Sequence, residues 1–165
     1  MPIRRPGKNK LSIKPLSNET FLAMLEHSAG SRVWQRMYAR VNGQRRDILH
    51  HGELSCAFYV SSLLRIFGWL KEVHATVDGT IKDLHASGWR RTTRPRPGDV
   101  VEWAPITYQD GEVHRHLGFY LDRGRAISTS FSRRTPIIHH LTYGRRGRPA
   151  YRRIVNIYAR PHRND

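Results

Sequence analysis

The residues whose chemistry stands out are a single cysteine and the run of sequence that it begins. Cys56 is the only cysteine of the chain, so it can form neither an intramolecular disulfide nor a cysteine-based zinc cluster. Residues 55–67 read SCAFYVSSLLRIF, which predicts a helix buried on most of its sides. Unpaired amides and the positive end of the dipole at a helix start stabilise a thiolate, the nucleophilic form of cysteine. The alternative interpretation of a lone cysteine is a small buried core residue.

Histidines that could assist a thiolate fall in a predicted strand over residues 113–121. In a strand, alternate residues share a face, so His114, His116 and Gly118 point to one side, and the leucine and phenylalanine side chains point to the other. The apolar side is expected to pack into a core, and the glycine leaves room for an imidazole to meet another group. A strand histidine alone is more often structural than catalytic. A role for His116 as a base therefore depends on its proximity to Cys56.

The elements that would position these residues run from helices to strands. Periodicity predicts helices over 17–30, 34–41, 55–67 and 77–87, and strands over 100–103, 113–121, 126–130, 136–140 and 154–158. In the turn at 97–99 the side chain of Asp99 is expected to close the turn. Helices followed by strands favour an α+β fold with an antiparallel sheet. The predicted organisation is a flexible basic arm over 1–16 and one domain over 17–165, comprising a helical extension over 17–46 and a catalytic core over 47–160.

Three motifs, in this order, resemble those of the NlpC-type papain-like cysteine peptidases, a group related to the cysteine- and histidine-dependent amidases. They are SCAFYV at 55–60, PGDVVEW at 97–103 and HLGFYL at 116–121, and the resemblance covers about residues 47–158. It implies a papain-like fold in which N-terminal helices and a central cysteine-bearing helix pack on an antiparallel sheet. It also implies a thiol hydrolase that cleaves peptide or amide bonds, with peptidoglycan stem peptides as the leading substrate.

The resemblance makes Cys56 the nucleophile and His116 the general base that takes its proton and later protonates the leaving amine. A third polar residue orients the imidazole in this family, commonly His, Asn or Gln. Counting residues across the predicted hairpin places Ser128 at that position, diagonal to His116 on the same face. His139 and His140 on the next strand are alternatives for this third role.

The predicted substrate-binding residues are Tyr59, Trp103, His114 and His139. The backbone amide of Cys56 is the natural donor to an oxyanion, and Tyr59 is a side-chain alternative. Trp103 is expected to form core or a wall of the cleft. The residue before the nucleophile is Ser55, where many members of the family carry an aspartate.

The chain is strongly basic and therefore attracts polyanions. Its 165 residues include 29 Lys and Arg against 13 Asp and Glu, a formal charge of +16, and 24 of the cations are arginine. Eleven arginines fall in the last 43 residues. The alternative to a hydrolase is a non-catalytic basic module that binds nucleic acid or another polyanion, although no nucleic-acid-binding motif supports it. The two functions could also occur in one protein, with the positive charge binding the enzyme to an anionic cell-wall polymer.

Other classes of protein are disfavoured. The most apolar stretch, 63–70, is interrupted by Arg65 and Gly68, so no membrane span is expected. No apolar segment follows the basic start, so we expect a cytoplasmic location or export by a non-standard route. The histidines lack the ligand spacing of a zinc site, so neither a metal nor a cofactor is expected. The protein is expected to be a monomer.

Overall fold

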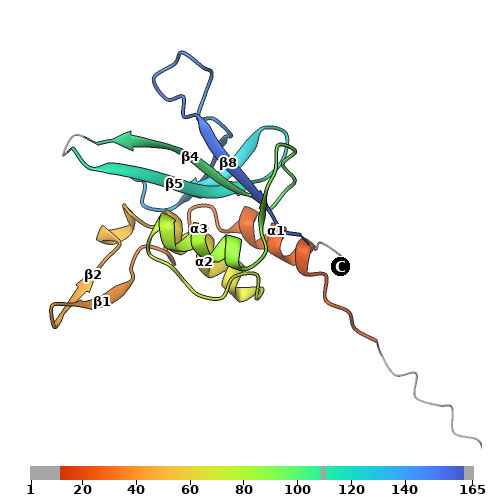
Figure 1. The fold of residues 1–165 in the computed structure, drawn as a ribbon, viewed down its shortest axis with the longest axis horizontal. Coiled ribbons are helices and arrows are strands. Elements are labelled where there is room, and N and C mark those ends of the chain that lie inside the picture. Colours follow the sequence, from red (N-terminus) through yellow and green to blue (C-terminus); the bar gives the residue numbers. More distant parts are fainter. Residues whose placement is uncertain (1–11, 109–110, 162–165) are drawn as a thin grey trace, which may run out of the picture.

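The structure, a computed structural model, describes residues 12–108 and 111–161 (Figure 1). In this part of the chain it contains three α-helices and two antiparallel sheets, which confirms the α+β class and the antiparallel sheet. Of the predicted basic arm, residues 1–11 lie outside the described residues, and 12–16 belong to no helix or strand. No helix in the described ranges is both long enough and apolar enough to cross a membrane.

The helices occupy the first half of the chain and the main sheet the second. The helical elements are α1 (Ser17–His27), a 3-10 turn η1 (His50–Gly52), α2 (Cys56–Ile66) and α3 (Val77–Ala86). The six-stranded sheet has the order β3-β8-β4-β5-β6-β7, formed by β3 (Arg90–Arg91), β4 (Val100–Thr107), β5 (Val113–Tyr120), β6 (Arg125–Thr129), β7 (Pro136–His140) and β8 (Ile154–Ala159). The predicted helices over 55–67 and 77–87 and the five predicted strands are confirmed, with small changes at their ends.

Helix α2 is the centre of the packing, as its nearly continuous apolar sequence predicts. Tyr59, Val60 and Leu63 on this helix are fully buried, and they share a core with Leu117 and Phe119 from β5. All three helices lie on one side of the six-stranded sheet (Figure 1). The helix side of β5 is therefore the apolar side of its alternating pattern, and the histidine side faces the opposite way.

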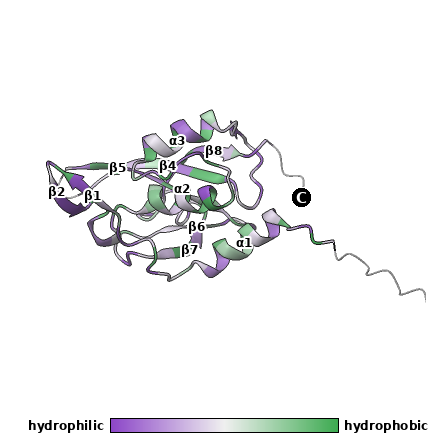
Figure 2. Ribbon diagram, turned by 90° about the horizontal axis from the view of Figure 1, so that it is seen from below, coloured by the Kyte–Doolittle hydropathy of each residue, from purple (hydrophilic) through white to green (hydrophobic). Residues whose placement is uncertain are grey.

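The predicted helix over 34–41 is wrong. Residues 38–47 form a hairpin of β1 (Tyr38–Val41) and β2 (Gln44–Asp47), joined by Asn42 and Gly43 with φ of 50° and 80°. Asn-Gly with both φ positive fits a two-residue hairpin turn better than a helix end. The hairpin projects from one end of the molecule and is largely hydrophilic (Figure 2). Tyr38 is 46% and Val41 40% exposed, so the helical spacing of apolar residues here does not mark a buried face.

A second apolar cluster lies on the histidine side of the sheet. Val101, Trp103 and Ala126 are buried there, and Leu141 and Tyr143 from the segment after β7 pack on them. Trp103 pairs directly with His116 across β4 and β5, and the register shifts between Trp103 and Ile106. A shift of this kind bends a strand and re-aims its side chains, and it lies next to the histidine-bearing part of β5.

Candidate active site

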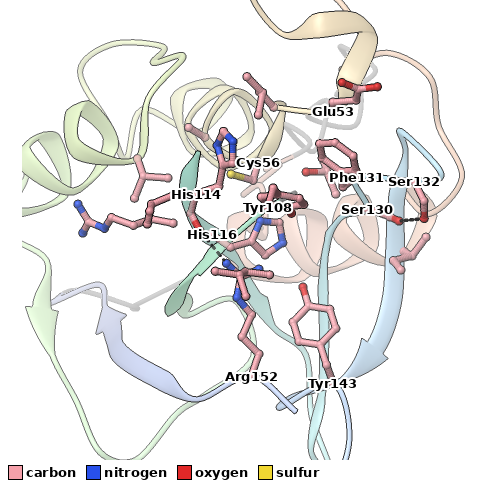
Figure 3. Close-up of a pocket in the computed structure, with 18 of the residues that line it drawn as sticks. Glu53, Cys56, Tyr108, His114, His116, Ser130, Phe131, Ser132, Tyr143 and Arg152 are labelled. Carbon is pink, nitrogen blue, oxygen red and sulfur yellow. Dashed lines mark hydrogen bonds between the residues drawn. The ribbon is translucent and has the colours of Figure 1, made fainter. Parts of the chain in front are cut away.

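The structure brings the two predicted catalytic residues to the same cavity. Cys56 is the first residue of α2 and is 9% exposed, and it lines a cavity of about 670 Å³ together with His116. The backbone N–H of Leu117, the residue that follows His116 on β5, lies near enough to the sulfur to lower the pKa of the thiol. Figure 3 shows Cys56, His114 and His116 on one side of this cavity, and Tyr143 and Arg152 reaching in from the C-terminal part of the chain.

The electrostatics of Cys56 correct one part of the sequence-based prediction. Burial raises the pKa of the Cys56 thiol. Four groups lower the pKa but do not outweigh burial: the backbone N–H groups of Leu117, Ala57 and Cys56 itself, and the positive charge of Arg152. The start of a helix therefore does not suffice to make this sulfur a resting thiolate, because the same position buries it.

Ser128 lies where counting across the hairpin predicts it. Its Oγ is 3.0 Å from Nε2 of His116, and the backbone pairs of β5 with β6 fix this register. The approach needs Gly118, since a Cβ there would lie 2.6 Å from Cβ of Ser128 and 2.5 Å from the carbonyl oxygen of Ile127. The glycine between the histidine and the tyrosine of β5 therefore allows the two strands to approach closely enough for this contact.

Hydrogen bonds around Ser128 determine which nitrogen of His116 carries a proton. Nδ1 of His139 lies 2.8 Å from the carbonyl oxygen of His140, so Nδ1 donates. Burial lowers the pKa of His139, and its neutral ring then has an unprotonated Nε2, which lies 2.8 Å from Oγ of Ser128. The Ser128 hydroxyl must therefore donate to His139. It accepts from its other two neighbours, Tyr143 at 2.7 Å and Nε2 of His116.

His116 is consequently a neutral imidazole with Nδ1 unprotonated. Its burial, followed by the positive charge of Arg152 and the neighbouring His139, holds the pKa of His116 well below its usual value. The ring has one proton, which Nε2 donates to Ser128, so the lone pair of Nδ1 is available as a proton acceptor. The site thus holds a neutral thiol and a neutral imidazole. A nucleophilic role for the sulfur would require the thiol proton to leave.

Of the four predicted substrate-binding residues, one lines the cavity and three do not. His114 lines the cavity, next to Tyr108 at 4.9 Å between ring centroids. Tyr59 does not: it is fully buried, and its hydroxyl bonds with Oγ of Ser28 at 2.7 Å. Its helical position turns it into the core, so it is neither a substrate contact nor an oxyanion donor, and that prediction is wrong.

Trp103 and His139 lie behind His116 and do not line the cavity. The Trp103 indole is fully buried, donates to the carbonyl oxygen of Leu141 at 2.7 Å and packs on His116 with ring centroids 5.5 Å apart. The prediction of substrate contact for Trp103 and His139 is therefore wrong, and both support the imidazole instead. His140 is exposed and bonds with Thr142, so of the two histidines offered for the third role only His139 reaches the network.

Two residues of the site carried no signal in the sequence. Tyr143 stacks on His139 at 3.9 Å between ring centroids, and burial raises its pKa to about 12, which keeps it a proton donor. Arg152 donates through Nε to the carbonyl oxygen of Ala104 at 2.8 Å and through Nη2 to that of His114 at 3.0 Å. Both come from the irregular segment between β7 and β8, where periodicity says nothing about side-chain direction.

The remaining motif residues have structural roles. Ser55 is 1% exposed and donates to the carbonyl oxygen of Gly52 at 2.8 Å, which closes the turn before α2. Asp99 is fully buried and accepts from the backbone N–H of Arg96 at 2.7 Å, which confirms its predicted role in closing the turn.

Neither a metal centre nor a relative gives a further constraint on function. Within 12–108 and 111–161, no three His, Cys, Asp or Glu side chains gather in a way that could hold a metal ion. No protein-family model matches the chain, and no curated protein matches it.

Proposed function

We propose that the protein is a papain-like thiol hydrolase of the NlpC type, with Cys56 as nucleophile and His116 as general base. The observation that carries this proposal is that Cys56, at the start of α2, and the neutral imidazole of His116 line the same cavity, where the backbone N–H of Leu117 lowers the pKa of the thiol. Peptide or amide bonds are the proposed substrates, and stem peptides of peptidoglycan are the first to test.

The reaction would begin with proton transfer from the Cys56 thiol to Nδ1 of His116 as the sulfur attacks the scissile carbonyl carbon. The backbone N–H at the start of α2 would stabilise the oxyanion of the tetrahedral intermediate. The proton on Nδ1 then passes to the leaving amine as the C–N bond breaks, which leaves an acyl thioester. Water, deprotonated by Nδ1, attacks the thioester and releases the carboxylic acid and the free thiol.

Ser128 and His139 would act through His116. By accepting the Nε2 proton, Ser128 holds the tautomer that leaves Nδ1 free, and His139 fixes the direction of the Ser128 hydroxyl. Neither touches the reacting atoms, so both are positioning residues. A serine held by a histidine and a tyrosine would thus fill the place of the His, Asn or Gln of the resembled family.

The test is digestion of purified peptidoglycan and of a mixed peptide library, followed by mass spectrometry of the products. Wild type should release fragments with a new amine and a new carboxylate, and the variant Cys56→Ala should release none. Cys56→Ser is the matched control, since it keeps the shape of the residue with a weaker nucleophile. Cleavage that survives in Cys56→Ala would contradict the proposal.

A polyanion-docking role also has an observation in its favour. Arg145, Arg146 and Arg148 are exposed in the loop between β7 and β8, on the side of the sheet away from the helices (Figure 1). The loop leads directly into residues 149–152, which line the cavity. We propose that it holds an anionic polymer near Cys56. Replacing the three arginines with Gln should weaken binding to the polymer and reduce its salt dependence, while Cys56→Ala should bind as wild type does.

A further inference from the structure

The hairpin of β1 and β2 concentrates positive charge at one end of the molecule. Its two strands form a sheet of their own, separate from the six-stranded sheet, and the hairpin projects away from the helices (Figure 1). Four exposed arginines lie on it or directly before it: Arg36, Arg40, Arg45 and Arg46. In the part of the chain that the structure describes, none of the four lies within ion-pair distance of an acidic group.

The register of the hairpin places two of these charges directly opposite each other. Arg40 pairs with Arg45 across the two strands, and paired side chains point to the same face. Tyr38 is two residues from Arg40 on the same strand and therefore shares this face. Like charges at opposed positions of a sheet are destabilising, so the stability of the fold does not explain the pair. An anion bound between the two guanidinium groups would replace the repulsion with attraction.

Tyr38 brings a third arginine to the same face. Nη1 of Arg36 donates to the phenol oxygen of Tyr38 at 3.3 Å, and the guanidinium of Arg45 lies over the ring, 3.6 Å from its centroid. The hydrogen bond from Arg36 and the charges of both arginines lower the pKa of Tyr38. Three guanidinium groups therefore surround one exposed phenol, and we call Arg36, Tyr38, Arg40 and Arg45 the arginine cluster.

Asp47 is the only acidic residue of the hairpin, and it does not neutralise the arginine cluster. Its carboxylate accepts from the backbone N–H groups of Met37, Leu49 and His51, which fixes the base of the hairpin. Burial raises the pKa of Asp47, but these N–H groups and the charge of Arg36 lower it below its ordinary value. One carboxylate offsets one of four positive charges, and the others are left for a partner.

The arginine cluster suits a partner that presents several phosphates within a short length. A guanidinium matches a phosphate in two-point fashion, and double-stranded DNA carries about one negative charge per 1.7 Å of its axis. Its major groove, about 12 Å wide, admits a two-stranded β-ribbon. A membrane surface fits less well, because it requires exposed apolar area, and Arg45 covers one face of the Tyr38 ring. Val41 is then the one large aliphatic side chain that the hairpin offers.

We infer that the β1–β2 hairpin binds double-stranded DNA, with Arg40 and Arg45 in contact with backbone phosphates. This inference goes beyond the proposed function and does not depend on it, since the hairpin contributes no residue to the lining of the Cys56 cavity. Contacts with phosphates carry no direct sequence information, so the affinity should vary little with base sequence.

The test measures binding of the chain to a fluorescent DNA duplex of about 20 base pairs by anisotropy, over a range of salt concentrations. Replacing Arg40 and Arg45 together with Gln should weaken binding and reduce the slope of log K against log salt concentration by about 2, one unit for each phosphate contact. Arg40→Gln alone should reduce it by about 1 and leaves Arg45 on the Tyr38 ring.

A matched control separates the hairpin from the general charge of the chain. Replacing Arg65 and Arg94 with Gln removes the same charge from two exposed residues elsewhere, and the slope should stay as in wild type. Thermal unfolding checks the fold of all variants, and the hairpin variants should unfold close to wild type because an opposed pair of charges is removed. Hydrolysis of substrate should be the same in the hairpin variants and in wild type, so the two proposals can fail separately.

Each outcome decides the question. Failure of the wild-type chain to bind the duplex overturns the inference, and so do equal losses in the hairpin variant and the control variant. Polyglutamate and vesicles that contain an anionic phospholipid are the competing polyanions. If either binds through Arg40 and Arg45 at least as tightly as the duplex does, the hairpin serves another partner and the assignment to DNA is wrong.

Discussion

Two charged residues on or beside the same strands, the buried Glu102 and the partly buried Arg152, are surrounded by opposite kinds of partner. Glu102 on β4 is 3% exposed, and its carboxylate accepts from Arg115, from Asn156 at 2.8 Å and from the hydroxyl of Tyr158 at 2.9 Å. Burial alone would raise the pKa of Glu102, but these donors lower it below its ordinary value.

Arg152 is paired only with two backbone carbonyl oxygens in the described residues, and its charge disfavours protonation of His116 instead of meeting an acid. A buried charge with its partners in place serves the fold, whereas one without a counterion is expected where a ligand or a reacting group completes it. Glu102 and its donors Arg115, Asn156 and Tyr158, here called the Glu102 cluster, should therefore control stability. The Cys56 cavity should control reactivity.

The largest effect is expected at His116. His116→Ala removes the proton acceptor and should lower the rate of substrate hydrolysis by about 10²- to 10⁴-fold. The thermal midpoint should change far less than the rate if the cavity serves reactivity, as we propose. Steady-state kinetics and thermal unfolding of the same samples provide the measurement. A loss of rate that merely follows a loss of folded protein would break the contrast between the two clusters.

The next largest effect is expected when Glu102 and Arg152 are replaced separately. Glu102→Gln keeps the shape but leaves Arg115 without its buried partner, so we expect the free energy of unfolding to fall by about 2–3 kcal/mol. Arg152→Gln removes an uncompensated charge, and its loss should stay below about 1 kcal/mol. Urea denaturation of both variants measures the difference. Similar losses in the two would show that both charges serve the fold.

A smaller effect separates two adjacent histidines. His139→Ala removes the acceptor that directs the Ser128 hydroxyl, and the loss of about one hydrogen bond should lower kcat roughly tenfold. His140→Ala is the control and should stay within about twofold, because the His140 side chain bonds with Thr142 in an exposed turn and the substitution leaves its backbone carbonyl in place. If His139 is a positioning residue, the pH at which activity falls on the acid side should differ between His139→Ala and wild type. An unchanged profile would leave it a packing residue.

The smallest expected effect concerns pH and stability. His116 has a lowered pKa in the folded protein, so the unfolded chain binds a proton more readily, and stability falls as the pH drops below about 6.5. Between pH 6.5 and 5.5 this group should contribute a loss of about 1 kcal/mol. His116→Gln should therefore lose less stability than wild type over that interval in urea denaturation. An identical pH dependence of the two proteins would argue against a neutral imidazole at this partly buried position.

The sequence predicted the elements that are strongly periodic and the contacts that depend on counting along them. Strand alternation and turn residues located β4 to β8, and the pairing of a short hairpin placed Ser128 beside His116. The hairpin at 38–47 was missed because an i, i+3, i+4 spacing ending at Asn-Gly fits a helix and a strand turn alike.

What depends on tertiary packing could not be predicted in this way. Tyr143 and Arg152 enter the site from an irregular segment, and one arginine among eleven near the chain end has no distinguishing neighbour. The sign of the pKa shift at Cys56 depends on how deeply the fold buries it, which a position at the start of a helix does not reveal.

The most direct test of the central proposal is the pH dependence of Cys56 alkylation by iodoacetamide in wild type and in His116→Gln. If Nδ1 of His116 takes the thiol proton, wild type should react measurably at pH values well below the raised pKa of the thiol. The variant should lose that component and react only as the thiol itself ionises. Superimposable profiles for the two proteins would show that His116 does not act on Cys56 and would contradict the proposed hydrolase.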